Sequence, residues 1–86
     1  MSKAPTITAE GIKEEIEWSY FFVVPDTTLT ICVLGLSNGF TVTGESACVS
    51  PEKFNAAMGE QIAYDNAFNK IWQLEGYRLA CRLAEE

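Results

Sequence analysis

The clearest pattern along the chain is an alternation of side-chain character over residues 27–36. Every second residue from Leu29 to Val33 is apolar and would lie on one face of a strand, whereas Thr30 and Cys32 would lie on the other. The stretch is also rich in β-branched residues, which favour strands. We therefore predict that residues 27–36 form a strand of a sheet.

Two further strands are predicted beside it. Residues 18–24 are aromatic and β-branched, and a Pro-Asp pair follows them with turn chemistry. Asn38 and Gly39 stand between two strand-like stretches, and Asn-Gly is a strong hairpin signal because both residues tolerate positive φ. Residues 40–43 are the predicted return strand, with Gly44 as a bulge or strand exit.

Helical spacing of apolar residues predicts a short helix over residues 9–17, capped by Thr8, and a long helix over residues 51–72. Ser50 followed by proline suggests the start of the long helix, since serine caps free N–H groups and proline suits the first helical position. Gly76 suggests a break before a short last helix over residues 77–83.

These elements give an α+β fold, in which a small antiparallel sheet is followed by a long C-terminal helix and a short last helix. The chain has 86 residues, so we expect one domain over residues 1–86, with residues 1–7 as a flexible tail. So small a domain has a thin core, and one face of the sheet or its edge is a natural surface for a dimer.

The net charge is −6, and the six basic residues are scattered rather than gathered into a stripe. An acidic surface repels nucleic-acid backbones, so we expect no binding to a nucleic-acid polymer. A small anionic ligand is less strongly disfavoured, because a few N–H groups and one or two cations can hold a phosphate. The chain shows no signal-peptide pattern and no long apolar run, so we expect a cytosolic protein and no membrane partner.

Cysteine spacing indicates reduced thiols at Cys32, Cys48 and Cys81, because the number is odd and no CxxC motif occurs. A zinc site would need these cysteines together with a carboxylate, and we expect no metal and no cofactor. Ser46 and Cys48 would need an adjacent base to act as nucleophiles, and the chain has no histidine. We therefore expect that the protein is not an enzyme.

Residues 28–83 resemble the small phage protein family typified by phage N4 gene product 49 and phage Sf6 gene 66. The resemblance lies in a set of residues in fixed order: Asn38-Gly39-Phe40, Glu45-Ser46-Ala47-Cys48-Val49, Pro51, Phe54, Gly59, Ala63, Lys70-Ile71-Trp72 and Leu74-Glu75-Gly76-Tyr77. Members of this family resemble the Thoeris anti-defence protein of the first type, a phage-encoded sponge.

That resemblance implies a homo-oligomer, either a dimer or a higher oligomer such as a hexamer, that sequesters a cyclic nucleotide immune signal in the host cytoplasm without cleaving it. The signal would be the cyclic ADP-ribose isomer of Thoeris, and some relatives are thought to hold the cyclic oligonucleotides of CBASS as well. One alternative is a phage inhibitor that binds a host protein directly, since an acidic surface suits a basic target. Another is an enzyme that acts on such signals.

Five residues are the candidate ligand-binding set: Phe40, Ser50, Lys53, Lys70 and Arg78. An aromatic ring such as Phe40 can stack on adenine, and the resemblance favours this role over a core position. Ser50 stands where sponge relatives carry asparagine, so it would replace that hydrogen bond only in part. Lys53, Lys70 and Arg78 are the candidates to meet phosphate charge.

The resemblance is incomplete on the long helix. Relatives often carry arginine near Ala67 or Phe68, and this chain has none there. Phosphate charge would then fall to the three cations of the candidate set, or to a neighbouring subunit, with Lys3 and Lys13 as its candidates.

Overall fold

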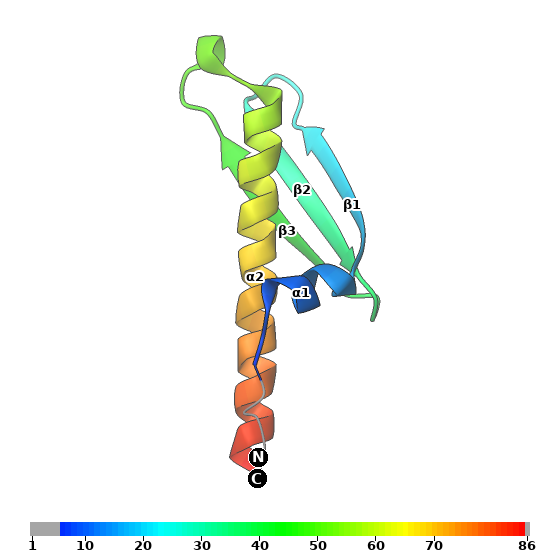
Figure 1. The fold of residues 1–86 in the computed structure, drawn as a ribbon. Helices are drawn as coiled ribbons and strands as arrows, with labels where there is room; N and C mark the ends of the chain where they lie inside the picture. Colours follow the sequence, from blue (N-terminus) through cyan, green and yellow to red (C-terminus); the bar gives the residue numbers. More distant parts are fainter. Residues whose placement is uncertain (1–5, 86) are drawn as a thin grey trace.

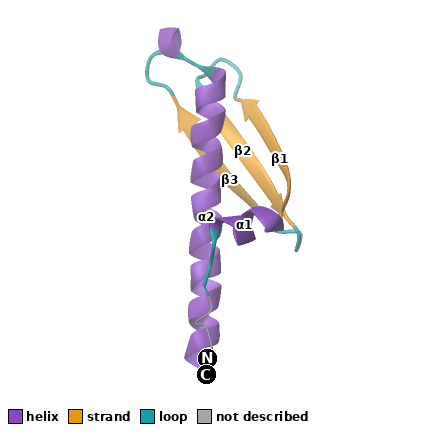
Figure 2. Ribbon diagram, viewed as in Figure 1, coloured by secondary structure: helices purple, strands orange, loops and turns teal. Residues whose placement is uncertain are grey.

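The computed structural model describes residues 6–85 of the chain, and most of the predicted N-terminal tail lies outside this range. The elements, in chain order, are α1 (Ala9–Glu15), β1 (Ile16–Val23), β2 (Leu29–Leu36), β3 (Thr41–Ala47), the 3₁₀ turn η1 (Pro51–Lys53) and α2 (Ala56–Glu85). Figure 1 and Figure 2 show one antiparallel sheet with α2 running along one of its faces. The predicted α+β fold, a small antiparallel sheet followed by a long helix, is confirmed.

The sheet has the strand order β1-β2-β3, with each strand antiparallel to its neighbour. The hairpin between β2 and β3 forms at the predicted Asn-Gly pair. Gly39 has a φ of 91°, and the Asn38 side-chain oxygen accepts a hydrogen bond of 2.9 Å from the Phe40 N–H. The Leu36 N–H donates to the Phe40 carbonyl at 2.8 Å and closes the turn.

The predicted role of Gly44 is wrong. Gly44 lies within β3, which extends to Ala47, and it pairs with Cys32 of β2 without a bulge. A Cβ at this position would overlap the carbonyl oxygen of Ala63 and the backbone nitrogen of Ala67. The glycine is therefore the place where the backbone of α2 comes closest to the sheet.

The short helix α1 begins as predicted, because the Thr8 hydroxyl accepts a hydrogen bond of 3.0 Å from the Gly11 N–H. It ends at Glu15, two residues before the predicted end, because Ile16 takes extended backbone and opens β1. Ile12 is its buried residue and joins the hydrophobic core.

The predicted start of the long helix is wrong. Pro51–Lys53 forms only a 3₁₀ turn, and Ser50 makes no side-chain capping hydrogen bond. Phe54 has φ −63° and ψ 129°, an extended conformation that ends this turn. α2 begins at Ala56, and the cap is Asn55, whose side-chain oxygen accepts a hydrogen bond of 3.1 Å from the Met58 N–H.

The predicted break at Gly76 is also wrong. α2 is one helix of 30 residues, and the separate last helix expected over residues 77–83 is its C-terminal part. A glycine inside a helix costs about 1 kcal/mol relative to alanine, which a long run of good helix formers on either side can offset.

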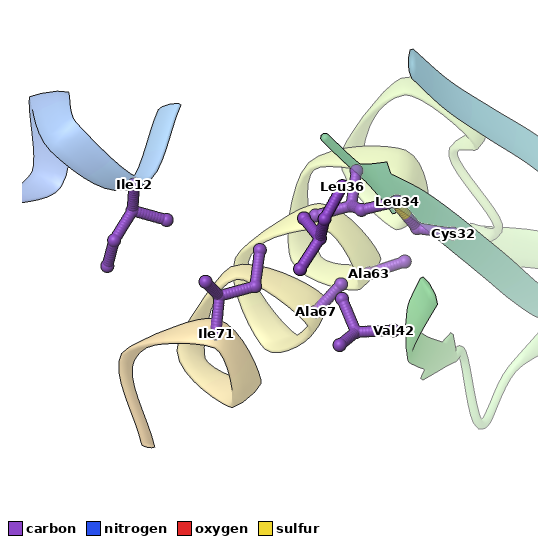
Figure 3. Packing of buried hydrophobic residues seen from close by; sticks show 8 residues of the cluster. All are labelled: Ile12, Cys32, Leu34, Leu36, Val42, Ala63, Ala67 and Ile71. Carbon is purple, nitrogen blue, oxygen red and sulfur yellow. The ribbon is translucent and has the colours of Figure 1, made fainter. Parts of the chain in front are cut away.

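The hydrophobic core lies between the sheet and the middle of α2. Figure 3 shows its side chains, which are Ile12, Cys32, Leu34, Leu36, Val42, Ala63, Ala67 and Ile71. The small residues Ala63 and Ala67 of α2 let the helix lie close to β2 and β3. Burial alternates along β2. Thr30 and Cys32 are buried on the face toward α2, whereas Leu29, Ile31 and Val33 lie on the opposite face.

The protomer is elongated, with extents of 56 × 22 × 19 Å and a radius of gyration of 15.9 Å. A compact chain of this length would have a radius of gyration of about 12 Å. The C-terminal half of α2 extends well beyond the sheet, which accounts for the shape (Figure 1). Among the described residues, no helix combines the length and the apolar character needed to cross a bilayer.

Candidate functional site

Phe40 stands at the end of the β2–β3 hairpin, and 55% of its surface is exposed. The hydrogen bonds of the turn hold the Phe40 backbone through both its N–H and its carbonyl, and the ring is not one of the core side chains. Two open hollows flank the ring, and Phe40 and Leu74 of α2 line both of them. An exposed ring on a rigid turn can stack on a planar ligand.

The first hollow has a volume of about 410 Å³ and lies between β3 and α2. Its polar side chains from the helix are Lys70 and Gln73, Thr41 and Thr43 of the strand also line it, and no carboxylate of residues 6–85 is among its lining residues. Pockets for small ligands have volumes of roughly 300–1,000 Å³. This hollow therefore combines an aromatic platform, one cation and several neutral hydrogen-bonding groups.

The second hollow has a volume of about 220 Å³ and lies between the hairpin, α1 and α2. Arg78 lines it and donates a hydrogen bond of 2.9 Å to Glu75, while 60% of the arginine side chain stays exposed. Burial and the hydrogen bond and charge of Glu75 raise the pKa of Glu15 above 4.5, and Arg78 partly opposes this rise. Two carboxylates therefore compete with any anion for Arg78.

Ser50 and Lys53 lie beyond the opposite end of the sheet from the hairpin that carries Phe40. The η1 turn that carries Lys53 lies beyond the N-terminal end of α2, whereas the β2–β3 hairpin lies near the middle of this helix (Figure 1). Lys53 lines a third, smaller hollow of about 90 Å³ beside Phe54 and Met58. One protomer thus brings together Phe40, Lys70 and Arg78, and these residues do not meet Ser50 or Lys53.

A comparison with known protein families gave a match over most of the chain. The model of the phage protein (N4 Gp49/phage Sf6 gene 66) family matches residues 7–83, which includes α1 and β1 as well as the stretch where the sequence resemblance lay. The chain belongs to this family. No curated protein and no solved structure matched it.

In this phage protein, the fold explains why arginine is missing at position 67. Ala67 is fully buried, and its backbone nitrogen lies against Gly44 of β3. Phe68 packs against the core beside Tyr64, with 5.9 Å between the ring centroids. Position 67 has no room for a longer side chain, and the half-buried ring of Phe68 packs on the core, so in this chain cations for a ligand come from other positions on the helix.

Three residues of this phage protein line the first hollow but were not among the ligand-binding residues predicted from the sequence. They are Thr41, Gln73 and Leu74. Gln73 and Leu74 follow Lys70 by three and four residues, so they share its face of the helix. That spacing is visible in the sequence. The spacing alone does not show which surface this helix face meets, and the fold places it beside β3.

The strand-to-helix connection offers no catalytic arrangement among the described residues. The Cys48 thiol is half-buried and donates a hydrogen bond of 3.0 Å to the Ser50 carbonyl. Burial, and to a lesser extent Glu60, raise the pKa of the Cys32 thiol above 9.0, which keeps it protonated at neutral pH. In residues 6–85, no cluster of cysteine and acidic side chains is arranged to hold a metal ion.

Proposed function

We propose that this phage protein is an anti-defence sponge that binds a cyclic nucleotide signal around Phe40 and sequesters it in the host cytoplasm without cleaving it. The observation that supports the proposal best is the exposed Phe40 ring, held on a rigid turn with Lys70 on one side and Arg78 on the other. The ligand would be the cyclic ADP-ribose isomer of Thoeris or a cyclic oligonucleotide of CBASS.

The first hollow suits the phosphates better than the second. Lys70 supplies a positive charge there without a neighbouring carboxylate among the lining residues, whereas Arg78 is paired with Glu75. The base would stack on Phe40, and the amide of Gln73 would hydrogen-bond the sugar or the base edge. Arg78 would add a second, weaker contact with an anion.

The same arrangement supports binding over catalysis. General acid–base catalysis needs a group whose pKa lies near the working pH, and covalent catalysis needs a nucleophile beside a base. The chain has no histidine, and the polar residues of the first hollow are lysine, glutamine and threonine. We therefore propose a stoichiometric trap and not an enzyme.

The proposal is tested by calorimetric titration of the purified protein with a cyclic ADP-ribose isomer, a cyclic dinucleotide and a cyclic trinucleotide. We expect micromolar or tighter binding of at least one of them. Phe40→Ala should weaken that binding about 5- to 150-fold, which corresponds to the 1–3 kcal/mol of one stacked base. Because the ring is exposed, this variant should keep its fold, and Phe40→Tyr should restore affinity.

A matched pair of lysine variants locates the phosphates. Lys70→Gln should weaken binding and reduce its dependence on salt, because one cation no longer contacts the ligand. Lys53→Gln makes the same chemical change beyond the N-terminal end of α2, away from Phe40, and should leave affinity unchanged if one chain forms the site. Absence of binding by every nucleotide would overturn the proposal, and capture of one basic host protein at saturation would favour the inhibitor alternative.

A further inference from the structure

β1 is an edge strand of the sheet, and α2 leaves it largely uncovered. β1 pairs with β2 on one side, whereas α2 packs over β2 and β3. Figure 1 shows β1 at the side of the sheet far from the helix. Within residues 6–85, no strand pairs with the other edge of β1. The backbone N–H and C=O groups of a free edge can pair with an extended segment of another chain.

A hollow of about 310 Å³ lies between β1 and α2. We call it the edge hollow. Phe21 of β1 forms one wall, and the other is formed by Ala57, Glu60, Gln61 and Tyr64 of α2. Because α2 lies over β2 and β3, the edge hollow is on the β1 side of the helix, next to the free edge. It shares no lining residue with the two hollows beside Phe40.

The edge hollow combines two aromatic rings with a carboxylate. The Tyr64 ring is held against Phe68, and Phe21 pairs with Cys32 across the sheet. The charge of Glu60 contributes to the raised pKa of the Cys32 thiol, so the carboxylate lies near this pair. Aromatic faces and a carboxylate both attract a cation. Arginine suits them better than lysine, because its planar guanidinium can stack on a ring and also donate two hydrogen bonds to a carboxylate.

The charges on both sides of the edge hollow favour a basic partner. Every charged residue of β1 and of residues 56–66 in α2 is acidic, and these residues are Glu17, Glu60 and Asp65. Glu60 is exposed, and no ion pair joins it to another described residue. A basic segment is therefore attracted to this edge, whereas a second copy of the chain, with its net charge of −6, would bring like charges together.

We propose that an extended, basic segment of another protein adds to the free edge of β1 as a fourth strand, with arginine side chains in the edge hollow. Side chains alternate between the two faces of a strand. The residues between the arginines therefore lie on the opposite face, beside Tyr20 and Phe22, whose rings are 60% and 39% exposed. The partner segment is thus one in which arginine alternates with apolar residues.

This inference does not depend on the proposed nucleotide site, because the two use different residues. The probe is a fluorescein-labelled peptide of eight residues in which arginine and valine alternate, titrated with the protein at about 0.15 M salt. We expect binding in the micromolar range. A second peptide with the same composition but with its arginines in one block carries the same charge without the alternation. It should bind about 5-fold more weakly or worse.

A matched pair of glutamate variants locates the arginine. Glu60→Gln should weaken binding of the alternating peptide about 5- to 20-fold, because the guanidinium loses its carboxylate. Glu85→Gln removes the same charge from the far end of the same helix and should leave the affinity unchanged. Both glutamates are exposed, so both variants should stay folded.

Amide hydrogen exchange followed by NMR tests the strand addition itself. The N–H groups on the free edge of β1 should exchange rapidly in the protein alone and become protected when the alternating peptide is bound. Three results would overturn the inference: no binding of this peptide, equal weakening by the two glutamate variants, or β1 amides that the peptide leaves unprotected. Protection that rises with protein concentration in the absence of peptide would also overturn it, because a second copy would then occupy the edge.

Discussion

Thr30 is fully buried between β2 and the first turns of α2, and its hydroxyl has no hydrogen-bond partner among the described residues. The helix approaches closely at this point, because a Cβ on Gly59 would lie 2.9 Å from the hydroxyl oxygen. A buried hydroxyl without a partner costs free energy on folding, since it gives up its hydrogen bonds to water.

We predict that Thr30→Val raises the free energy of unfolding by about 1 kcal/mol, because a methyl group of similar shape replaces the unpaired hydroxyl. In a domain of this size that gain corresponds to an increase in Tm of about 4–8 °C. Thermal unfolding followed by circular dichroism measures it. A lower Tm would mean that the hydroxyl has a partner in solution.

Single residues were predictable from sequence where their conformation is decided locally. Thr8 and the Asn38-Gly39 pair act through hydrogen bonds within three residues, and all three were assigned correctly. Ser50 was misassigned as the cap of the long helix because the extended backbone at Phe54 decides where α2 can begin. Its capping role passes to Asn55, another residue with good capping chemistry.

The two glycines Gly44 and Gly76 have opposite consequences for the elements that contain them. We predict that Gly44→Ala lowers the free energy of unfolding by about 1–3 kcal/mol or more, because its Cβ must push the backbone of α2 away from β3. Gly76→Ala should raise it by about 0.5–1 kcal/mol, because no atom lies within 4 Å of the new Cβ and alanine favours the helix.

Urea unfolding of the Gly44→Ala, Gly76→Ala and wild-type proteins measures both changes in the free energy of unfolding. The two variants carry the same glycine-to-alanine substitution, so their opposite effects can be compared directly. If Gly76→Ala proved destabilising, a close contact at Gly76 with another molecule would be indicated. If Gly44→Ala were neutral, the close approach of α2 to the sheet would be contradicted.

The contact between α1 and α2 should make stability depend on pH. Burial and Glu75 raise the pKa of Glu15 in the folded protein, so the folded state favours the protonated carboxyl. The stabilisation from this group is complete below pH 4.5 and is lost as the pH rises through the raised pKa. We predict that Glu15→Gln removes this part of the pH dependence and stabilises the protein at neutral pH.

Urea midpoints measured between pH 4 and pH 7 check the prediction for Glu15. The wild-type and variant proteins should diverge as the pH rises, with the variant more stable at the upper end. A constant difference across the range would show that the Glu15 carboxyl does not titrate with an altered pKa in the folded protein.

The helices and strands were predictable in type because each follows a repeating pattern of side chains. The ends of these helices and strands were less predictable, because tertiary contacts decide where each element begins and stops. Gly76 and Gly44 show the difference: each looked like a break in a local pattern, yet α2 continues through the first and β3 through the second. The packing of α2 against the sheet gives Gly44 its role, and sequence periodicity carries no information about that contact.

The whole molecule decides which candidate residues can share a ligand. Phe40 precedes Lys70 and Arg78 by 30 and 38 residues in the chain, and they meet because α2 runs back along the sheet past the hairpin. Ser50 and Lys53 are nearer to Phe40 in sequence but lie beyond the other end of the sheet. Their contribution to the same site would require a second protomer, which the Lys53→Gln variant tests.

Sequestration without cleavage is best tested by recovering the ligand. The protein is saturated with the nucleotide that it binds, passed through a desalting column, heated until it unfolds, and the released material is identified by mass spectrometry. We predict about one intact cyclic nucleotide for each site, and a much smaller amount from Phe40→Ala. Release of a linear or otherwise altered nucleotide, or no retained nucleotide at all, would contradict a sponge.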